Sequence, residues 1–441
     1  MKILIFLPLF LFLASAVALD DVTVLTVATE ENDGFKRFLR SARVYGVAVE
    51  VLGKGETWNG GDMNYAGGGQ KVNLLKEKLS ELIKTKDKDH IVLFTDSYDV
   101  MYLGGVDSIV DRFKAMEGTR VLFSAEPFCW PDAKLASMYP NTEVPSPYLN
   151  SGGFIGYLPE IFEIVNAREI KDKDDDQLYY TKVYLNEKLR GTLRINLDHK
   201  SEIFQNLNGA LSDVQLRINS TEPIPEEWPF VENVATKQRP LIIHGNGPSK
   251  LTLNHLGNYL AKSWSHKEGC TLCEENRIKL EDEHLPKVML AVFIEQSTPF
   301  LEDFLKQLLD IDYPKNKLQL LLRNNVEYHE EMVDKFFQEH SKEYATAKRI
   351  KPSDFISEAE ARDIAKDRCV SSVCDYLFSV DSVARVDSRT LRYLLSSGYG
   401  VLAPLLVRPG QAWSNFWGAI NASGFYARSA DYMEIVYNSI R

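Results

Sequence analysis

HIVLFTDSYDVMYLGG, residues 90–105, is the stretch that decides the fold. Residues 91–95 are apolar or β-branched and predict a buried strand, which is followed at once by Asp96 and Asp99. In open α/β sheets, ligands bind beyond the carboxyl ends of the strands, and two carboxylates that face one point repel each other unless a cation lies between them. The stretch therefore predicts an α/β sheet with a metal site at its edge. The alternative is an ordinary turn, in which Asp and Ser are common.

The surrounding sequence supports an α/β fold. Residues 21–30, DVTVLTVATE, predict a strand. Residues 67–90 then predict an amphipathic helix, opened by a glycine run, with these apolar residues on one face: Val72, Leu75, Leu79, Leu82 and Ile83. Strand, helix and strand at these lengths form a βαβ unit, so we expect a parallel sheet with helices on its faces.

A second strand-first pattern begins at residue 287. KVMLAVFIEQ (287–296) predicts a strand, residues 299–311 a helix, and residues 318–325 and 375–386 two further strands. The charged stretch 267–286 between the two patterns lacks periodicity and is interpreted as a linker. We therefore expect one α/β domain over 19–266 and a similar one over 287–441, the second incomplete at its C-terminal end.

The composition restricts the classes of function. The 441 residues include 44% hydrophobic and 26% charged residues, as in soluble globular proteins, and are enough for two or three domains. The net charge of −11 argues against a nucleic-acid binder and does not favour an anionic membrane surface. It is compatible with a cation site.

The N-terminus and the cysteines indicate the compartment. Residues 1–18 carry one Lys, an apolar run and a small-residue end at Ala18, which predicts a cleaved signal peptide; the alternative, a membrane anchor, would need a longer apolar run. The protein is then expected in the endoplasmic reticulum lumen or secreted. Disulfides are expected within two close pairs, and two glycosylation acceptors fit the same compartment. The cysteine pairs are Cys270 with Cys273 and Cys369 with Cys374, and Cys129 is left over. The glycosylation acceptors are Asn219 and Asn421.

RPLIIHGNGPSK, residues 239–250, has the same order of features as the opening stretch. An apolar strand ends at His244, and Gly247 and Lys250 follow. An imidazole is a suitable third ligand for Mn²⁺, glycine lets backbone N–H groups approach phosphate, and a lysine adds a positive charge. A lone His is more often a satisfied core residue, but the Gly-rich turn and Lys250 favour a diphosphate–metal site built with Asp96 and Asp99.

Three further segments carry candidate site residues. KDKDDDQLYY (171–180) is either a solvated charge run or a helix start that aims a carboxylate into a cleft, where it could act as a base or stabilise cationic charge. EPFCWPD places Trp130 in a loop after a strand. NSGGFIGYLP (150–159) is interpreted equally well as a tight turn between core strands or as a substrate contact.

Ten strings, in order and spread over nearly the whole chain, resemble the animal procollagen lysyl hydroxylases. They are TVATEENDGFKRFLRSA, GGGQKV, LFTDSYDV, FCWP, LNSGGFIGY, DDDQLYYTK, IFQNLNGAL, IIHGNGPSKLTLNHLGNY, VFIEQSTPF and WSNFWGAI. The resemblance implies a lumenal GT-A (Rossmann-like) glycosyltransferase domain, a similar accessory domain, and a C-terminal dioxygenase domain that uses Fe²⁺, 2-oxoglutarate and ascorbate. Such enzymes hydroxylate collagen lysines, and one form also adds galactose and glucose to the hydroxylysine.

The resemblance also implies roles for individual residues. Mn²⁺ would be bound by Asp96, Asp99 and His244, and the catalytic acids would be Asp175 and Asp176. The nucleotide would be lined by Val27, Ala28, Thr29, Ser97 and Tyr98. The diphosphate would be held by Gly247, Pro248, Ser249 and Lys250, and the sugar would be gated by Trp130. The strings FCWP and DDDQ are more similar to the glycosylating form.

Two departures limit the resemblance. None of the eight histidines begins the His-x-Asp pattern of the iron site, so the dioxygenase domain is expected to be missing from this chain. In the accessory domain Asp381 follows a strand without a second carboxylate, so that domain is expected to be structural.

These features lead to one main expectation and two alternatives. We expect Mn²⁺-dependent transfer of glucose or galactose from a UDP-sugar to hydroxylysine of collagen, with no nucleic-acid partner. The resemblance also implies a homodimer as an expectation for the full-length family. The alternatives are a non-catalytic portion of a procollagen-lysine 5-dioxygenase and a collagen-binding module.

Overall fold

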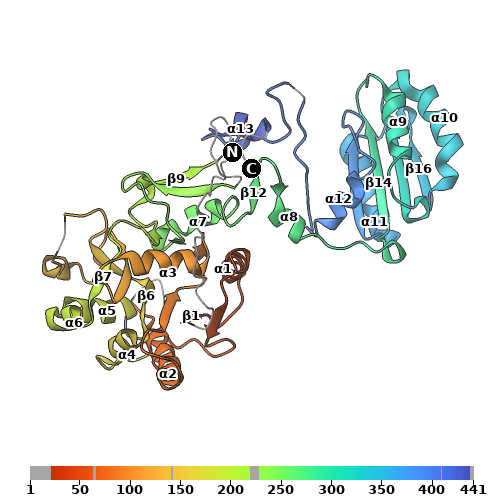
Figure 1. Cartoon of the computed structure of the whole chain (residues 1–441). Helices are drawn as coiled ribbons and strands as arrows, with labels where there is room; N and C mark the ends of the chain where they lie inside the picture. Colours follow the sequence, from red (N-terminus) through yellow and green to blue (C-terminus); the bar gives the residue numbers. More distant parts are fainter. Residues whose placement is uncertain (1–20, 63–65, 141–142, 219–227, 409, 438–441) are drawn as a thin grey trace, which may run out of the picture. The chain divides into compact units, whose positions relative to one another are not determined.

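The computed structural model describes residues 21–62, 66–140, 143–218, 228–408 and 410–437 (Figure 1). The expected signal peptide and the acceptor at Asn219 lie outside the described residues. The chain divides into two compact units between Leu272 and Cys273, and each is described by itself. None of the helices in the described ranges has the length and apolar character of a membrane span.

The first unit is built on a six-stranded mixed sheet in the order β2-β1-β3-β6-β5-β7. Strand β1 pairs in parallel with β2 and β3, which confirms the predicted strand–helix–strand unit. The expectation of a wholly parallel sheet is wrong, because β6 runs antiparallel to both β3 and β5. The strands are β1 (Val22–Val27), β2 (Val49–Leu52), β3 (Ile91–Thr95), β5 (Val121–Glu126), β6 (Tyr148–Tyr157) and β7 (Ile195–Leu197).

Helices cover both faces of this sheet. On one face, α2 (Gly69–Thr85) buries the predicted residues Val72, Leu75 and Leu79 in a core shared with α4 (Leu158–Asn166) and α5 (Asp176–Leu185). On the other face, Phe35 and Phe38 of α1 (Asp33–Val44) pack in a second core with α3 (Val106–Ala115). All five residues of β3 are buried between these layers, as its apolar sequence predicts.

A small three-stranded sheet joins three distant segments beside the large one. Its order is β4 (Val100–Tyr102), β11 (Ile242–His244) and β8 (Phe204–Asn206). In the antiparallel pair of β4 and β11, His244 lies opposite Val100. Because Asp99 precedes Val100, this register brings the imidazole to the carboxylates that follow β3.

The remaining elements of the first unit are short. They include a hairpin of β9 and β10, and another of β12 and β13 that ends within the predicted linker. Their bounds are α6 (Glu187–Thr192), β9 (Val214–Arg217), β10 (Phe230–Asn233), α7 (Lys250–Leu256), β12 (Trp264–Ser265) and β13 (Gly269–Cys270).

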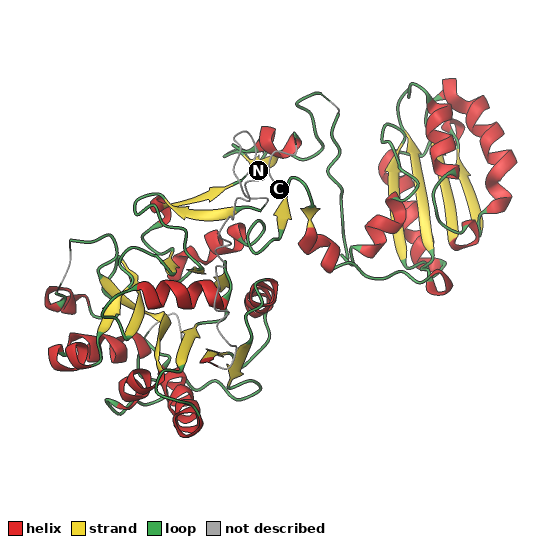
Figure 2. Ribbon diagram, viewed as in Figure 1, coloured by secondary structure: helices red, strands yellow, loops and turns green. Residues whose placement is uncertain are grey.

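The second unit holds a four-stranded parallel sheet in the order β16-β15-β14-β17, with helices on both faces (Figure 2). Strands are present in all three segments for which the sequence predicts them. The sheet and its helices are β14 (Val288–Ile294), α9 (Leu301–Leu309), β15 (Leu318–Asn324), α10 (Glu330–His340), β16 (Thr346–Ile350), α11 (Glu358–Ser371), β17 (Tyr376–Asp381) and α12 (Thr390–Ser396). The other elements are α8 (Thr271–Glu275), which begins at the boundary between the units, β18 (Gly418–Ile420), β19 (Tyr426–Arg428) and α13 (Tyr432–Val436).

The cysteines follow the predicted pattern. Cys369 and Cys374 form a disulfide that closes the end of α11 onto the start of β17. Cys270 and Cys273 are also disulfide-bonded, and Cys129 is free.

Candidate active site

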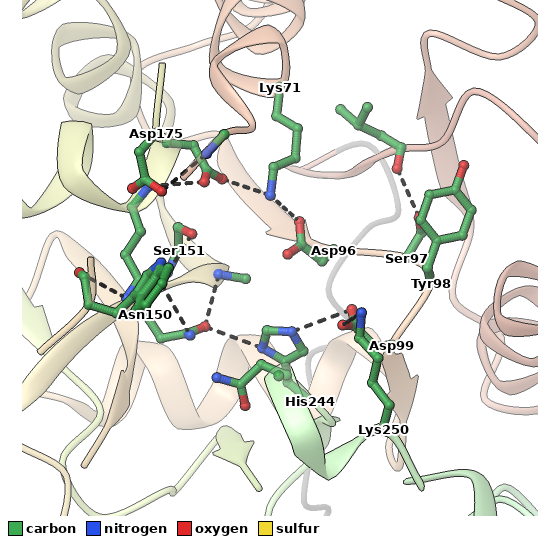
Figure 3. Close-up of a pocket in the computed structure, with 18 of the residues that line it drawn as sticks. Lys71, Asp96, Ser97, Tyr98, Asp99, Asn150, Ser151, Asp175, His244 and Lys250 are labelled. Atoms are coloured by element: carbon green, nitrogen blue, oxygen red, sulfur yellow. Dashed lines mark hydrogen bonds and ion pairs between the residues drawn. The ribbon is translucent and has the colours of Figure 1, made fainter. Parts of the chain in front are cut away.

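A cleft of about 1150 Å³ opens in the first unit, at the carboxyl ends of β1, β3 and β11 (Figure 3). The structure brings nearly all of the predicted site residues to its walls. They are Val27, Ala28, Thr29, Asp96, Ser97, Tyr98, Asp99, Trp130, Asp175, Asp176, His244, Gly247, Pro248 and Lys250.

Ser249 is the predicted residue that does not line the cleft. Its side chain is buried, and its hydroxyl donates a hydrogen bond to the carbonyl oxygen of Asn246 at 2.7 Å. This bond fixes the turn that precedes α7, so Ser249 shapes the turn and its hydroxyl is directed into the protein.

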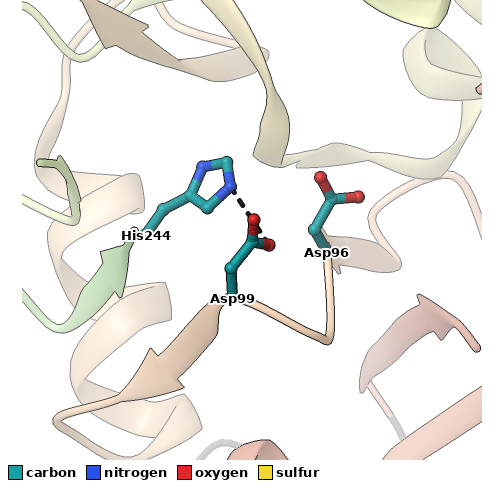
Figure 4. A group of neighbouring side chains, drawn as sticks. All are labelled: Asp96, Asp99 and His244. Carbon is teal, nitrogen blue, oxygen red and sulfur yellow. Dashed lines mark ion pairs between the residues drawn. The ribbon is translucent and has the colours of Figure 1, made fainter. Parts of the chain in front are cut away.

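Asp96, Asp99 and His244 form a candidate metal centre (Figure 4). Each offers one ligand atom, and these atoms all lie within 4.8 Å of one another. His244 Nε2 is 3.5 Å from Asp99 Oδ1, and Lys250 Nζ is 3.6 Å from Asp99 Oδ2. Two carboxylate oxygens and one imidazole nitrogen are a donor set that suits Mn²⁺.

Two amides determine which nitrogen of His244 faces the carboxylates. Asn206 Nδ2 donates to the carbonyl oxygen of Ala125 at 2.7 Å, so its Oδ1 is the atom that lies 2.9 Å from His244 Nδ1. Asn150 Oδ1 accepts from the N–H of Gly152 and lies 3.2 Å from the same Nδ1. Because both oxygens are acceptors, Nδ1 carries the proton and Nε2 presents its lone pair to the metal position.

The three candidate ligands also affect one another electrostatically. Burial on its own would raise the pKa of Asp99, but His244 and Lys250 outweigh it and hold that pKa at about 2. Burial favours neutral His244, and the adjacent Asp99 outweighs this and raises the histidine pKa. Burial raises the pKa of Asp96. A bound divalent cation would relieve both burial penalties by pairing with the carboxylates.

Lys71 is a buried residue of the site that sequence reasoning missed. Its Nζ lies 2.9 Å from Asp96 Oδ1 and 2.7 Å from Asp176 Oδ2 (Figure 3). Burial would lower the pKa of Lys71, but Asp176 and Asp96 outweigh it and raise that pKa above its usual value. The ammonium therefore stays charged and joins the metal side of the cleft to the acid side. A lysine in the first turn of a helix, two residues after a run of three glycines, was the available signal.

The two predicted acids begin helix α5 and differ in their contacts. Asp175 is the N-cap: its Oδ1 accepts from the N–H of Leu178 at 2.6 Å, and its Oδ2 from the N–H of Gly67 at 3.3 Å. Burial, with the adjacent Asp176, raises the pKa of Asp175 to about 6. Asp176 is the first helical residue and pairs with Lys71. The structure favours the helix start over the solvated charge run, because Asp175 and Asp176 begin α5 and line the cleft.

Ser97 and Tyr98 hold the loop that follows β1. The Ser97 hydroxyl donates to the carbonyl oxygen of Val27 at 2.8 Å, and the Tyr98 hydroxyl accepts from the N–H groups of Thr29 and Glu30 at 3.1 and 3.2 Å. The loop and the turn between the metal carboxylates are thereby tied together, which places the Val27–Thr29 backbone against the cleft.

A second buried carboxylate, Glu126 at the end of β5, organises the opposite wall. Its Oε1 accepts from Asn150 and Gln177 at 3.0 and 2.8 Å, and its Oε2 from Asn246 at 2.8 Å. Trp130 is about half exposed at the cleft. Nothing in the local sequence of Glu126 distinguishes it from an ordinary strand end.

The second unit has a different arrangement at the corresponding strand end. Asp381 ends β17 and forms an ion pair with Arg362 of α11 at 2.7 Å. Among the described residues, the metal-type cluster found is the one in the first unit.

The α/β fold, with two carboxylates and an imidazole at the carboxyl ends of its strands, is of the GT-A glycosyltransferase type. Residues 18–270 match the family described as the PLOD GT domain, and residues 325–440 match the glycosyltransferase family 25 N-terminal domain. The chain belongs to the procollagen-lysine hydroxylase (PLOD) family, and its first unit is the family's glycosyltransferase domain.

Curated relatives agree over nearly the whole chain. It is 44% identical to procollagen-lysine,2-oxoglutarate 5-dioxygenase 2 of Mus musculus, over 95% of this chain and 56% of the relative. It is also 44% identical to the multifunctional procollagen lysine hydroxylase and glycosyltransferase LH3 of Rattus norvegicus, over 96% of this chain and 56% of the relative. The chain thus spans about half the length of these relatives, and identity does not separate the two forms.

A solved structure shows a weaker likeness. A glycosyltransferase involved in the glycosylation of the major capsid of PBCV-1 is 10% identical, with a TM-score of 0.33, over 53% of this chain and 98% of that one.

Proposed function

We propose that the first unit transfers glucose or galactose from a UDP-sugar to the hydroxyl group of hydroxylysine in collagen, with Mn²⁺ as the metal. The observation that carries the proposal is the convergence of Asp96, Asp99 and His244 beside Lys250, on a cleft whose other wall holds Asp175 and Asp176. The collagen acceptor is suggested by the names of the relatives.

The residues divide into a donor side and an acceptor side. The Val27–Thr29 backbone lines the position proposed for the nucleoside, and the turn at Gly247 and Pro248 with Lys250 lines the position proposed for the diphosphate. When bound, Mn²⁺ would neutralise the negative charge that develops on the leaving diphosphate. Lys250, which contacts Asp99 and keeps more than half of its side chain exposed, adds a further positive charge there.

Sugar transfer requires one bond to form and one to break. The acceptor oxygen bonds to C1 of the sugar, the bond from C1 to the diphosphate oxygen breaks, and UDP leaves. Asp175, whose pKa of about 6 suits a base near neutral pH, takes the proton of the hydroxyl group. The Asp176 carboxylate, held by Lys71, stabilises positive charge on the sugar ring.

We also propose that this reaction takes place in the endoplasmic reticulum lumen or later in the secretory pathway. The Cys369–Cys374 disulfide supports an oxidising compartment.

UDP release with UDP-glucose or UDP-galactose and a hydroxylysine-bearing collagen peptide tests the activity. The wild-type chain should release UDP only when Mn²⁺ and the peptide are present. Asp176→Asn should keep donor binding and lower turnover on the order of 100-fold or more. Peptide binding without any UDP release would instead favour a collagen-binding module.

A further inference from the structure

Gly152 lies where two of the candidate metal ligands meet. Its carbonyl oxygen accepts a hydrogen bond from the N–H of Asp96 at 2.9 Å. A Cβ atom placed on Gly152 would lie 2.2 Å from Cε1 and 2.6 Å from Nδ1 of His244. One residue of β6 therefore contacts both Asp96, which follows β3, and His244, which ends β11.

The segment 150–159 was interpreted as a tight turn or as a substrate contact, and the substrate contact stays a prediction, since residues 150–152 line the cleft. The segment is not a tight turn, because β6 continues from Tyr148 to Tyr157. It is an irregular part of that strand: Phe123 of β5 pairs with Phe154, whereas the next residue, Ser124, pairs with Asn150. Such a bulge bends a strand locally and often lies beside an active site.

The irregular part of β6 also contains Asn150, a hydrogen-bond partner of His244 Nδ1. The N–H of Gly152 donates to Asn150 Oδ1 at 2.9 Å, and this oxygen lies 3.2 Å from His244 Nδ1. The imidazole is thus enclosed by the Gly152 backbone on one side and by two amide oxygens at Nδ1, and it is almost fully buried. A larger residue at position 152 would therefore push the imidazole out of this enclosure, toward the cleft that His244 lines.

Given the metal site proposed above, we infer that Gly152 is a positioning residue that sets the separation of Asp96 and His244. Its carbonyl fixes the main chain of Asp96, and its missing side chain leaves the space that the imidazole occupies. A separation under 3.0 Å between a Cβ and a ring atom does not occur without movement of one of them. Any side chain at position 152 therefore displaces His244 Nε2 from the metal position.

Gly152→Ala and Gly153→Ala in the full chain make a matched pair. The added Cβ at Gly153 would lie 2.8 Å from Cδ1 of Phe204, in the core beside the metal centre, and Gly153 does not line the cleft. Both variants overpack and should lose thermal stability. Calorimetric titration of Mn²⁺ in the presence of UDP should show affinity lowered about 10- to 100-fold in Gly152→Ala, the range for disturbed outer-shell partners of a metal, and unchanged in Gly153→Ala.

A thermal-unfolding cycle with His244→Ala tests the contact without any metal. Removing the imidazole removes the atoms that the new Cβ would meet, so Gly152→Ala should lower the melting temperature in the wild-type background and much less in the His244→Ala background. If Gly152→Ala alone does not fold, the double variant should fold.

Two results would overturn the inference: wild-type Mn²⁺ affinity in Gly152→Ala, or an equal loss of stability in both backgrounds. Failure of the wild-type chain to bind Mn²⁺ with UDP is a different result. It would overturn the proposed metal site, and the unfolding cycle would still decide whether Gly152 packs on His244.

Discussion

Lys71 Nζ lies 2.7 Å from Oδ2 of Asp176 in the buried wall of the cleft. The same nitrogen lies 2.9 Å from Asp96 Oδ1, so a single ammonium separates a candidate metal ligand from a candidate catalytic acid. Without this charge, the carboxylates of Asp96 and Asp176 would face each other with no cation between them. Like charges repel strongly when they are buried. Lys71 is therefore as necessary to the arrangement as the acids themselves.

Lys71→Met should destabilise the first unit by about 3–5 kcal/mol, the usual cost of removing one partner from a buried ion pair. Urea unfolding measures this loss. Lys78→Met on the same helix is the control, because Lys78 pairs with a partly exposed Glu50, and such surface pairs contribute about 0–1 kcal/mol. Equal losses in the two variants would show that Lys71 does not neutralise the buried carboxylates.

Asp175→Asn should separate the role of Asp175 as the N-cap of α5 from its proposed role as the catalytic base. Asn is as good an N-cap as Asp, so this variant should be at least as stable as the wild type at neutral pH and should lose turnover. Asp175→Ala should lose turnover and be about 1 kcal/mol less stable than Asp175→Asn, because the Leu178 N–H loses its acceptor. Full turnover in Asp175→Asn would exclude a role for the carboxylate in proton transfer.

The pH dependence of turnover and of stability follows from the raised pKa of Asp175, which burial moves from 3.8 to about 6. Turnover should fall as the pH drops through about 6, because a protonated carboxyl group cannot take the proton of the substrate hydroxyl group. The folded state binds this proton more tightly than the unfolded chain, so the contribution of Asp175 to stability declines as the pH rises from 3.8 to about 6. Unfolding of Asp175→Asn across this range should lack that decline; an identical pH profile in the variant would contradict the assignment.

The second unit should be cut by trypsin before the first. Its residues 399–437 expose many large apolar side chains, among them Val401 at 95% and Tyr426 at 79%, and segments with few buried contacts open readily. We expect the earliest cut after Arg428, followed by sites within 287–396. Mass spectrometry of the fragments gives the order, and earliest cuts within β1–α5 would contradict it.

The fold was predictable where one segment carries its own pattern. The spacing of Val72, Leu75 and Leu79 predicted α2, and the unbroken apolar run 91–95 predicted a strand buried on both faces. The antiparallel β6 was not predictable in this way. Its glycines resemble a turn, and only the bulge against β5 explains why they lie inside a strand.

The clustering of the candidate metal ligands was predictable, and the residues that support them were not. Asp96, Asp99 and His244 follow apolar strands, and this position is visible in the sequence. Glu126 contacts Asn150, and Asn206 contacts His244. The partners in each pair are distant in the sequence, so these contacts exist only once the sheets have formed. The resemblance implied Ser249 at the diphosphate with the rest of the run 247–250, whereas the Ser249 hydroxyl is bonded within its own turn.

The most direct test of the metal site is calorimetric binding of UDP, with and without Mn²⁺, to the wild-type chain, Asp96→Ala, His244→Ala and Asp381→Ala. Asp381 also follows a parallel strand but pairs with Arg362 in the second unit, so it is the matched control. UDP should bind the wild type and Asp381→Ala tightly only when Mn²⁺ is present, and this Mn²⁺-dependent binding should be lost in Asp96→Ala and His244→Ala. Unchanged UDP affinity in both of these variants would contradict the account.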